Sequence, residues 1–331
     1  MSPVSRILIR LPNWLGDALM ARPMLHELAR RFPGAERLAV GRKPLLDLLA
    51  MDGAFERAEA WPPGPGVSRS AARGRMRAFE PHLALVLPPS FSSAWLAWRT
   101  GARERVGFAH EARSVLLTRA VRRPARGEQH LADEYCALLA PEPASTPPTP
   151  ELRLTAESVR RADEIVEALG AGGTRIALLG PGALYGPAKR WPGERFADLA
   201  RRLRAHGLTV LVCGAPAEAE ACAAVARAAG VESLATRTDL LTQAGLCARA
   251  ALAVCNDSGL AHLAAAVGTP TVALFGSTSS AWSAPRGPRV RVVQHAPVCS
   301  PCFRRTCRIG YRCLTAIEVG EVERACRELA A

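Results

Sequence analysis

The chain has 331 residues, 49% of them hydrophobic, which is long enough and apolar enough for two domains with proper cores. Its net charge of +13 is spread evenly, with 21 basic and 14 acidic side chains (+7) in residues 1–150 and 22 and 16 (+6) in residues 151–331. This spread argues against a basic arm for nucleic acid. The positive charge itself is consistent with contact to an anionic membrane surface or an anionic substrate, and an arginine-rich genome explains it equally.

The first half alternates short apolar strands with helices. No apolar run reaches the about 18 residues of a transmembrane helix, and the N-terminus lacks a signal-peptide core, so we expect a cytoplasmic protein. Alternation of strands and helices predicts a parallel sheet. The predicted strands are residues 7–11, 37–41, 55–61, 83–87 and 105–108. The predicted helices cover residues 25–32, 44–51 and 68–79, and a fourth contains Trp95 and Trp98.

Residues 140–150 contain five prolines and no apolar periodicity, which is typical of a linker. From residue 151 the alternation restarts, so we expect an N-terminal domain at 1–150 and a C-terminal domain at 151–331. Two such halves predict two Rossmann-like domains with a cleft between them. The second half has predicted strands at 175–179, 208–213, 232–235, 250–255 and 271–275, and predicted helices at 156–169, 193–206, 216–229, 239–248, 260–267 and 319–329.

Four loops are candidates for the functional site. Ligands of parallel sheets bind beyond the carboxyl ends of the strands. The loops at residues 12–17, 88–93, 180–190 and 256–260 all follow predicted strands, so each is expected to open into the cleft.

The turn at residues 256–260 begins a helix of small residues. A loop at a helix N-terminus offers free backbone N–H groups and the positive end of the helix dipole. The pattern therefore predicts an anion site, and phosphate is the usual anion. An ordinary strand–helix turn with a polar cap explains the same residues equally well.

A second loop, residues 180–192, ends in Lys189 and Arg190. Only Lys43 and Lys189 are lysines among the 43 basic residues, so the chain has a compact ammonium here where it otherwise uses arginine. An ammonium is a good point-charge partner for a diphosphate. The alternative is a solvated surface charge.

Four stretches carry a resemblance to a known family: LPNWLGDALMARPML, VLPPSFSSA, GPGALYGPAKRWP and NDSGLAHLAAAVGTPTVALFG. Together they resemble the heptosyltransferases of lipopolysaccharide core synthesis, glycosyltransferase family 9, and most of all the heptosyltransferase II branch. The resemblance covers nearly the whole chain. It implies an α/β fold of GT-B architecture and an inverting transferase without a catalytic metal or other cofactor.

The resemblance also implies substrates and a location. The donor is expected to be ADP-L-glycero-D-manno-heptose, bound by the C-terminal domain, and the acceptor the inner core of lipopolysaccharide, bound by the N-terminal domain. The enzyme is expected in the cytoplasm, at the periphery of the inner membrane and in contact with its anionic surface, with no nucleic-acid partner. A related family 9 transferase with another nucleotide sugar or a protein acceptor is the alternative.

Roles for single residues follow from the same resemblance. Asp17, at a helix start after the first strand, is the candidate general base, unless it only caps the helix. Asp257 either accepts from a ribose hydroxyl or caps its helix, and Glu218 is either a ribose-binding carboxylate or a solvated helix residue. The candidate nucleotide-sugar residues are Gly182, Lys189, Glu218, Asp257, Ser258, Gly259 and Leu260, and the candidate acceptor residues are Ser90, Arg103, Arg105 and Arg113.

Some positions fit the resemblance less well. Leu184 stands where a polar residue is common in the family, and Pro89 stands where an asparagine is expected before Ser90. His262 is more typical of a packed helix histidine than of a catalyst. For each candidate acceptor arginine, a solvated basic surface is the alternative.

Four cysteines lie within fifteen residues, with the spacing Cys-x2-Cys-x4-Cys-x5-Cys. Four thiolates suit a structural zinc or an iron–sulfur cluster, while free thiols are equally expected in a reducing cytoplasm and disulfides are not. With four nearby arginines the cluster also suggests a zinc-binding nucleic-acid module, although aromatic residues are only 5% of the chain. These cysteines are Cys299, Cys302, Cys307 and Cys313, and the arginines are Arg304, Arg305, Arg308 and Arg312.

Overall fold

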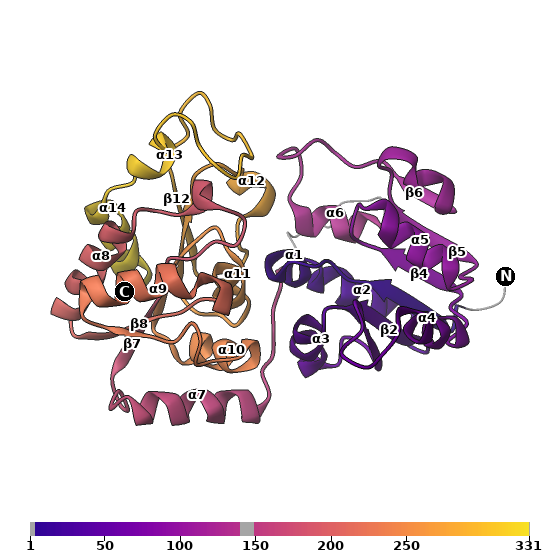
Figure 1. Ribbon diagram of the computed structural model, residues 1–331, viewed down its shortest axis with the longest axis horizontal. Helices are drawn as coiled ribbons and strands as arrows, with labels where there is room; N and C mark the ends of the chain where they lie inside the picture. The colour runs from indigo at the N-terminus through magenta and orange to yellow at the C-terminus, as the bar shows by residue number, and fades with distance from the viewer. Residues whose placement is uncertain (1–3, 140–148, 331) are drawn as a thin grey trace. The chain divides into compact units, whose positions relative to one another are not determined.

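The computed structural model describes residues 4–139 and 149–330. The chain forms two compact units, Met1–Pro150 and Glu151–Ala331, coloured from indigo to magenta and from magenta to yellow in Figure 1. Most of the predicted linker, residues 140–148, lies outside the described residues. Each unit is a parallel sheet with helices on its faces, which confirms the predicted α/β class.

The N-terminal sheet has six parallel strands in the order β3-β2-β1-β4-β5-β6. Its central strands are almost wholly buried because they are apolar runs covered on both faces, as parallel sheets require. The strands are β1 (Arg6–Arg10), β2 (Glu36–Gly41), β3 (Arg57–Ala60), β4 (Leu83–Val86), β5 (Glu104–Phe108) and β6 (Arg119–Val121).

Successive side chains of each strand point to opposite faces of this sheet, and helices cover both faces. Leu8, Val40 and Val86 point to one face, where they pack against α4 and α5. Helices α1, α2, α3 and α6 pack on one another over the other face. The helices are α1 (Leu15–Met20), α2 (Arg22–Arg31), α3 (Lys43–Leu49), α4 (Arg69–Ala78), α5 (Phe91–Arg99) and α6 (Leu131–Ala137), with 3₁₀ turns η1 (Ala50–Asp52) and η2 (Glu111–Leu116).

The C-terminal sheet repeats the same plan, with the order β12-β11-β10-β7-β8-β9. All of its strand pairs are parallel. Its strands are β7 (Arg175–Gly180), β8 (Leu208–Val212), β9 (Glu232–Ser233), β10 (Leu252–Asn256), β11 (Thr271–Phe275) and β12 (Val290–Gln294).

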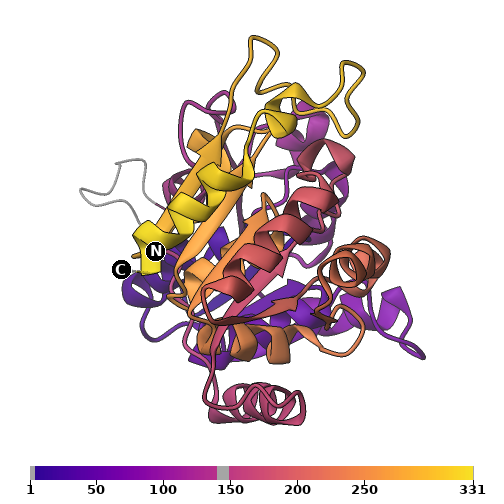
Figure 2. The ribbon, with the colours of Figure 1, turned by 90° about the vertical axis from the view of Figure 1, so that its left-hand side faces the viewer.

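One face of the C-terminal sheet carries α8, α9 and α14, which share a core with the strands. Figure 2 shows α14, in yellow, lying along β12 and beside α8. Helices α10 and α11 lie on the other face, and α7 packs on α10. The elements are α7 (Ala156–Ala168), η3 (Pro187–Lys189), α8 (Gly193–Ala205), η4 (Pro216–Glu218), α9 (Ala219–Ala229), α10 (Leu240–Arg249), α11 (Gly259–Ala266), α12 (Ser280–Ser283), α13 (Arg312–Thr315) and α14 (Val319–Ala330).

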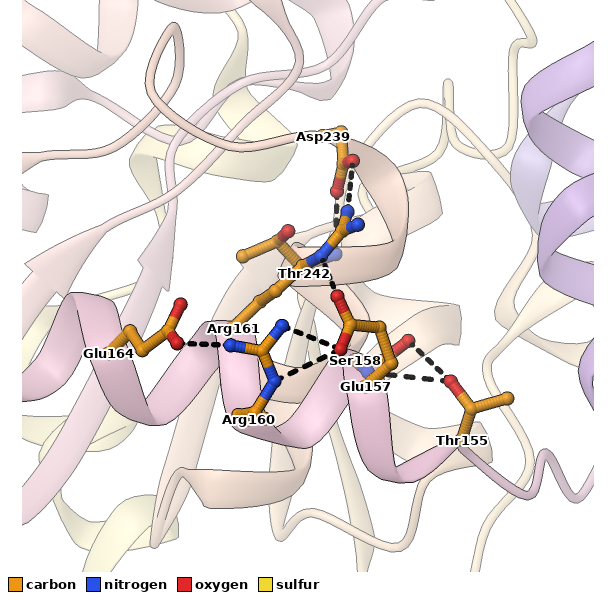
Figure 3. A network of polar contacts seen from close by, with 8 residues as sticks. All are labelled: Thr155, Glu157, Ser158, Arg160, Arg161, Glu164, Asp239 and Thr242. Carbon is orange, nitrogen blue, oxygen red and sulfur yellow. Dashed lines mark hydrogen bonds and ion pairs between the residues drawn. The ribbon is translucent and has the colours of Figure 1, made fainter.

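Helices α7 and α10 approach each other closely. A Cβ atom on Gly245 would lie 2.1 Å from the carbonyl oxygen of Ser158, so only glycine allows this contact. Above it, Arg161 Nη1 lies 3.5 Å from Asp239 Oδ2, and Asp239 caps α10 by accepting from the N–H of Thr242 (Figure 3). The contact fixes α10, which lies directly before the central strand β10.

Both sheets reverse their strand order once, between β1 and β4 in the first unit and between β7 and β10 in the second. Doubly wound sheets bind ligands at such a reversal, beyond the carboxyl ends of the two strands. The four loops predicted for the site follow these four strands. Among the described residues, no helix combines the length and the apolar character needed to cross a membrane.

Candidate active site

Asn256 joins the two site loops of the C-terminal unit. It ends β10 and is completely buried. Its Nδ2 donates to the carbonyls of Pro181 (2.8 Å) and Gly182 (3.4 Å), and its Oδ1 accepts from the N–H of Trp191 at 3.0 Å. One side chain therefore fixes the loop after β7 to the end of β10, because buried polar groups of this kind are rigid when all of them are paired.

Lys189 and Asp257, predicted separately, form a buried ion pair. Lys189 Nζ lies 2.6 Å from Asp257 Oδ2, and their side chains are only 14% and 4% exposed. Thr278 Oγ1 donates to the same carboxylate oxygen. The alternative of a solvated lysine is therefore wrong, and Asp257 is not the helix cap, because Ser258 is the N-cap of α11.

The first turn of α11 offers backbone donors beside this pair. Ser258, the N-cap, has extended backbone angles and makes no side-chain cap hydrogen bond. The first N–H groups of a helix have no partner within the helix, and they carry the positive end of its dipole. The N–H groups of Ser258, Gly259 and Leu260 are therefore donors available to an anion, one residue along the chain from the Asp257 that pairs with Lys189.

Tyr185 is a site residue that the sequence reasoning missed, although it lies inside the quoted GPGALYGPAKRWP stretch. Its ring lies 4.9 Å from Lys189 Nζ and 5.8 Å from the guanidinium of Arg305. Its hydroxyl donates to the carbonyl of Phe303, and its own carbonyl accepts from Arg305 Nε at 2.7 Å. These contacts hold the lysine in place from the side of the cysteine-containing loop.

Glu218 packs directly against Gly182. A Cβ on Gly182 would lie 2.4 Å from the carboxyl carbon of Glu218, so the glycine makes room for the acid. Glu218 is 9% exposed and accepts from the N–H of Ala215 at 2.8 Å, so the alternative of a solvated helix residue is wrong. Burial raises the pKa of Glu218, while the N–H of Ala215 and the charge of Arg190 act in the opposite direction.

Asp17 lies in the first turn of α1, directly beyond β1. Trp14 is the N-cap of this helix, so Asp17 does not cap it. The carboxylate is half-buried and lies near the buried phenol of Tyr135 on α6. Burial raises the pKa of Tyr135 well above its usual value, and the negative charge of Asp17 raises it further. Asp17 is therefore held at the edge of a packed environment.

Ser90 is the N-cap of α5 and lies beyond β4. Its Oγ accepts from the N–H of Ser93 at 3.3 Å, and the residue is exposed. Asp17 and Ser90 thus follow the two strands that flank the reversal of the N-terminal sheet.

The three predicted acceptor arginines require correction. Arg113 is 0% exposed, and its guanidinium donates to the carbonyls of Val86 and Pro88, so it supports the end of β4. Arg103 and Arg105 lie at the amino end of β5, the opposite edge of the sheet from Asp17, and Arg105 is bonded to the carbonyls of Leu116 and Ala102. Arg103 and Arg105 therefore lie at the edge of the sheet opposite to Asp17, and the guanidinium of Arg113 is bonded to the backbone at the end of β4.

The four clustered cysteines are not gathered around one point in the described structure. No group of three His, Cys, Asp or Glu side chains in residues 4–139 and 149–330 is placed to hold a metal ion. Cys313 belongs to α13 and is buried in the core, and Cys299 and Cys302 are exposed. Cys307 Sγ accepts from the N–H groups of Ile309 and Tyr311, so this thiol is engaged with the backbone of its own loop.

The exposed part of this loop is basic instead. A shallow hollow of about 280 Å³ is lined by Arg304, Arg305, Thr306 and Arg308. The backbone N–H of Ile309, that of Tyr311 and the charge of Arg304 lower the pKa of Cys307. Without a metal-ligand set, the zinc-module alternative has no structural support.

Comparisons with known proteins agree with these features. Residues 70–312 match the model of glycosyltransferase family 9 (heptosyltransferase). The chain is 30% identical to lipooligosaccharide heptosyltransferase 2 of Haemophilus influenzae over 310 residues, which covers 87% of this chain and 88% of that protein. It is also 30% identical to lipopolysaccharide heptosyltransferase 2 of Escherichia coli, with the same coverage.

A solved structure resembles the whole chain. ADP-heptose lipopolysaccharide heptosyltransferase II of E. coli superimposes with a TM-score of 0.82 at 26% identity, covering 98% of each chain. This similarity confirms the expected GT-B fold class. The family match spans well over half of the chain and the relatives cover most of it, and the chain therefore belongs to glycosyltransferase family 9, the heptosyltransferases.

Proposed function

We propose that this protein transfers heptose from ADP-L-glycero-D-manno-heptose to the inner core of lipopolysaccharide, with inversion at the anomeric carbon. The observation that carries the proposal is the Lys189–Asp257 pair beside the N-terminus of α11, in a chain similar to heptosyltransferases of the second type along most of its length. The pair and the helix end provide a cation and backbone donors at one strand reversal.

The C-terminal unit binds the donor. The ammonium of Lys189 and the N–H groups of residues 258–260 hold the diphosphate, whose negative charge increases as the sugar leaves. Glu218 and Asp257 are the carboxylates for the ribose hydroxyls. Gly182 leaves the space that the Glu218 carboxylate occupies.

The N-terminal unit binds the acceptor and supplies the base. Asp17 takes the proton of the acceptor hydroxyl, the hydroxyl oxygen attacks the anomeric carbon from the side opposite to the diphosphate, and ADP leaves with the bonding electron pair. Attack from the opposite side inverts the anomeric centre. Ser90, at the neighbouring strand end, contacts the acceptor. No step needs a metal ion, because Lys189 and the helix N-terminus supply positive charge for the leaving group.

The enzyme works in the cytoplasm, at the inner face of the inner membrane. The net charge of +13 supports this location, because basic proteins are attracted to anionic lipid surfaces. Sedimentation with vesicles of anionic phospholipid at physiological salt, compared with neutral vesicles, tests this part of the proposal. Equal sedimentation with both kinds of vesicle would contradict it.

A donor panel tests the central proposal. The purified protein is incubated with a lipopolysaccharide inner-core acceptor and one of four donors: ADP-heptose or a UDP-, GDP- or CMP-sugar. We expect product and released nucleotide with ADP-heptose only. Faster turnover of another donor would replace the proposal with the related-transferase alternative.

A further inference from the structure

The cysteine-containing loop, residues 299–313, is fixed at one end to the turn that follows β11. There the carbonyl of Ser277 accepts from the N–H groups of Cys302 (3.0 Å) and Phe303 (2.8 Å). Ser277 directly precedes the threonine whose hydroxyl donates to Asp257. This end of the loop therefore holds the turn that supports the carboxylate of the buried ion pair.

The same loop is fixed at a second point to the segment that carries Lys189. Arg305 Nε donates to the carbonyl of Tyr185 at 2.7 Å, and the carbonyl of Arg305 accepts from the N–H of Ala188 at 3.0 Å. The Tyr185 hydroxyl donates to the carbonyl of Phe303. These three hydrogen bonds join the loop to the residues directly before the lysine, so one loop contacts the supports of both members of the pair.

The contact between the two segments is close. A Cβ on Gly186 would lie 2.6 Å from the carbonyl oxygen of Arg305, and the φ of Gly186 is +148°, so both space and backbone angle require glycine there. Phe303 has a φ of +53° although it is not glycine, and its ring packs edge-on against Trp282 with the ring centroids 6.0 Å apart. Folds keep such unfavourable backbone angles where the surrounding contacts require them.

The ring of Tyr185 lies against two cations. Its centroid is 4.9 Å from Lys189 Nζ and 5.8 Å from the guanidinium carbon of Arg305. A cation near an aromatic face is attracted by the charge distribution of the ring. The ammonium of a lysine ends a flexible four-carbon stem, so keeping it in one position costs side-chain entropy. The ring and Asp257 together restrict where this ammonium lies.

We propose that Tyr185 and Arg305 are positioning residues of the transfer reaction and act through Lys189. Arg305 orients Tyr185, the ring restricts the lysine, and the lysine contacts the diphosphate of the donor. The inference rests on the proposed function and deepens it, because it assigns the cysteine-containing loop to the donor site. Negative charge grows on the diphosphate as the sugar leaves, so an ammonium held in place stabilises the transition state more than the bound donor.

The first test is a double-mutant cycle in which calorimetry measures ADP affinity. Tyr185→Leu and Arg305→Ala are made alone and together with Lys189→Met. Alone, each should weaken ADP binding about fivefold, the size of one cation–π contact. In the Lys189→Met background each should change ADP affinity less than twofold, because a residue that acts through the lysine loses its effect with it. A role confined to holding the loop would weaken ADP binding equally in both backgrounds.

Two further variants are the controls. Tyr185→Phe keeps the ring beside Lys189 and removes only the hydroxyl, so its ADP affinity should stay within about twofold of the wild type. Arg308→Ala removes the same charge as Arg305→Ala from an exposed position in the same loop. It should leave ADP affinity unchanged. Equal losses in Arg308→Ala and Arg305→Ala would reduce the effect to the overall charge of the loop and overturn the proposal.

The second test measures steady-state transfer from ADP-heptose. Tyr185→Leu should lower kcat about tenfold, more than it lowers ADP affinity, because the lysine matters most when the diphosphate leaves. The acceptor KM should change less than twofold, and Tyr185→Phe should recover most of the lost kcat. A change confined to the acceptor KM would overturn the assignment to the donor site.

The positioning role and the proposed transfer reaction fail separately. Additive losses of ADP affinity in the cycle, in a wild type that transfers heptose, would overturn the positioning role and keep the proposed function. A wild type that binds ADP and transfers no heptose, but whose cycle shows the coupling to Lys189, would remove the transfer reaction and keep the positioning of the lysine.

Discussion

The two units have the same strand order, but the buried cation at the strand reversal is paired with a carboxylate in one unit and not in the other. In the C-terminal unit the buried ammonium of Lys189 is paired with Asp257, and Thr278 satisfies the same carboxylate. In the N-terminal unit the buried guanidinium of Arg10 has only neutral oxygen partners. The first site is electrostatically complete without ligand, and the second has a positive charge in excess.

This difference matches the different tasks of the two sites. A donor site must hold a diphosphate and then release it, so a cation shared with a carboxylate avoids binding the product too tightly. The unit proposed to bind the acceptor instead keeps a buried guanidinium with only neutral oxygen partners. The comparison predicts that substitutions at the two points change different quantities.

The largest expected effect is on turnover, from Asp17→Asn in the N-terminal unit. The amide keeps the shape and removes the basic oxygen, and loss of a general base typically costs about 100- to 10,000-fold. Binding of ADP-heptose, measured by calorimetry, should stay within a few-fold, because the donor is held by the other unit. A variant that keeps near-normal turnover would show that Asp17 is not the base.

The next largest effect is a difference in stability between variants of the two buried cations, Lys189 and Arg10. Lys189→Met leaves Asp257 buried with one hydroxyl partner, and breaking a buried pair in this way costs about 3 kcal/mol. Arg10→Met removes a charge that has no carboxylate partner and leaves the carbonyls of Leu11 and Val40 without this donor, so its loss of stability in chloride should be smaller than that of Lys189→Met. Lys189→Met should also weaken ADP binding, and Arg10→Met should not.

The control is a double variant. Lys189→Met combined with Asp257→Asn removes both charges and should recover much of the lost stability, which a double-mutant cycle measures directly. A cycle without coupling between the two positions would contradict the pair, and a large loss of stability in Arg10→Met would contradict the contrast.

A smaller effect is expected from Gly182→Ala. The added Cβ would lie 2.6 Å from Glu218 Oε1, so the carboxylate must move. Overpacking of this kind costs about 1–3 kcal/mol, and ADP affinity should fall by about tenfold if Glu218 holds the ribose. Gly207→Ala is no suitable control because its φ is positive, whereas Gly193→Ala has room and should leave ADP affinity unchanged. Equal affinities in the two variants would remove Glu218 from the site.

The smallest effect is the response to alkaline pH. Burial raises the pKa of Cys213 and of Cys326 to about 12 in the C-terminal unit, so the folded state keeps protons that the unfolded chain loses. Their stabilisation is present below the ordinary thiol pKa of about 9 and is lost as pH rises toward 12. Arg10, whose folded pKa is lowered to about 10, destabilises the fold below that pH, and this cost is relieved as pH rises further.

Unfolding followed from pH 9 to 11.5 separates these contributions. Cys326→Ala should reduce the alkaline loss of stability, and Arg10→Met should enlarge it, each on the order of 1 kcal/mol. Burial also raises the pKa of Tyr135, so this residue adds to the alkaline loss of stability. Its contribution is the same in every variant and therefore cancels when variants are compared. If both variants changed the alkaline loss of stability in the same direction, the predicted contrast between the two units would be contradicted.

Most of the fold was predictable, because apolar runs indicate the strands and helices, and glycine and proline residues indicate where they end. Two of the elements that the sequence did not predict depend on distant partners. The edge strand β12 forms by pairing with β11, and the short helix α6 packs on α1 and α2. Neither has a periodicity long enough to stand out. Glycine and proline correctly marked the loops at the strand ends.

The site was predictable in part. Strand and motif order placed Lys189 and Asp257 in neighbouring loops, but their pairing depends on the bonds of Asn256 across those loops, which no local pattern reveals. The acceptor arginines were expected to meet the acceptor that the family resemblance implies, with no local pattern to show whether they are exposed, and the structure buries Arg113. A charge inside the apolar strand ILIRL was the available sign of Arg10, because a buried strand rarely contains an arginine without a reason.

Hydrogen exchange with and without ligand tests the division of tasks between the two units most directly. Saturating ADP should slow exchange at the amides of residues 183–190 and 258–260 and leave residues 11–17 unchanged. Addition of the inner-core acceptor should then protect residues 11–17. Protection of residues 11–17 by ADP alone, with no change at residues 258–260, would contradict a donor site in the C-terminal unit and an acceptor site in the N-terminal one.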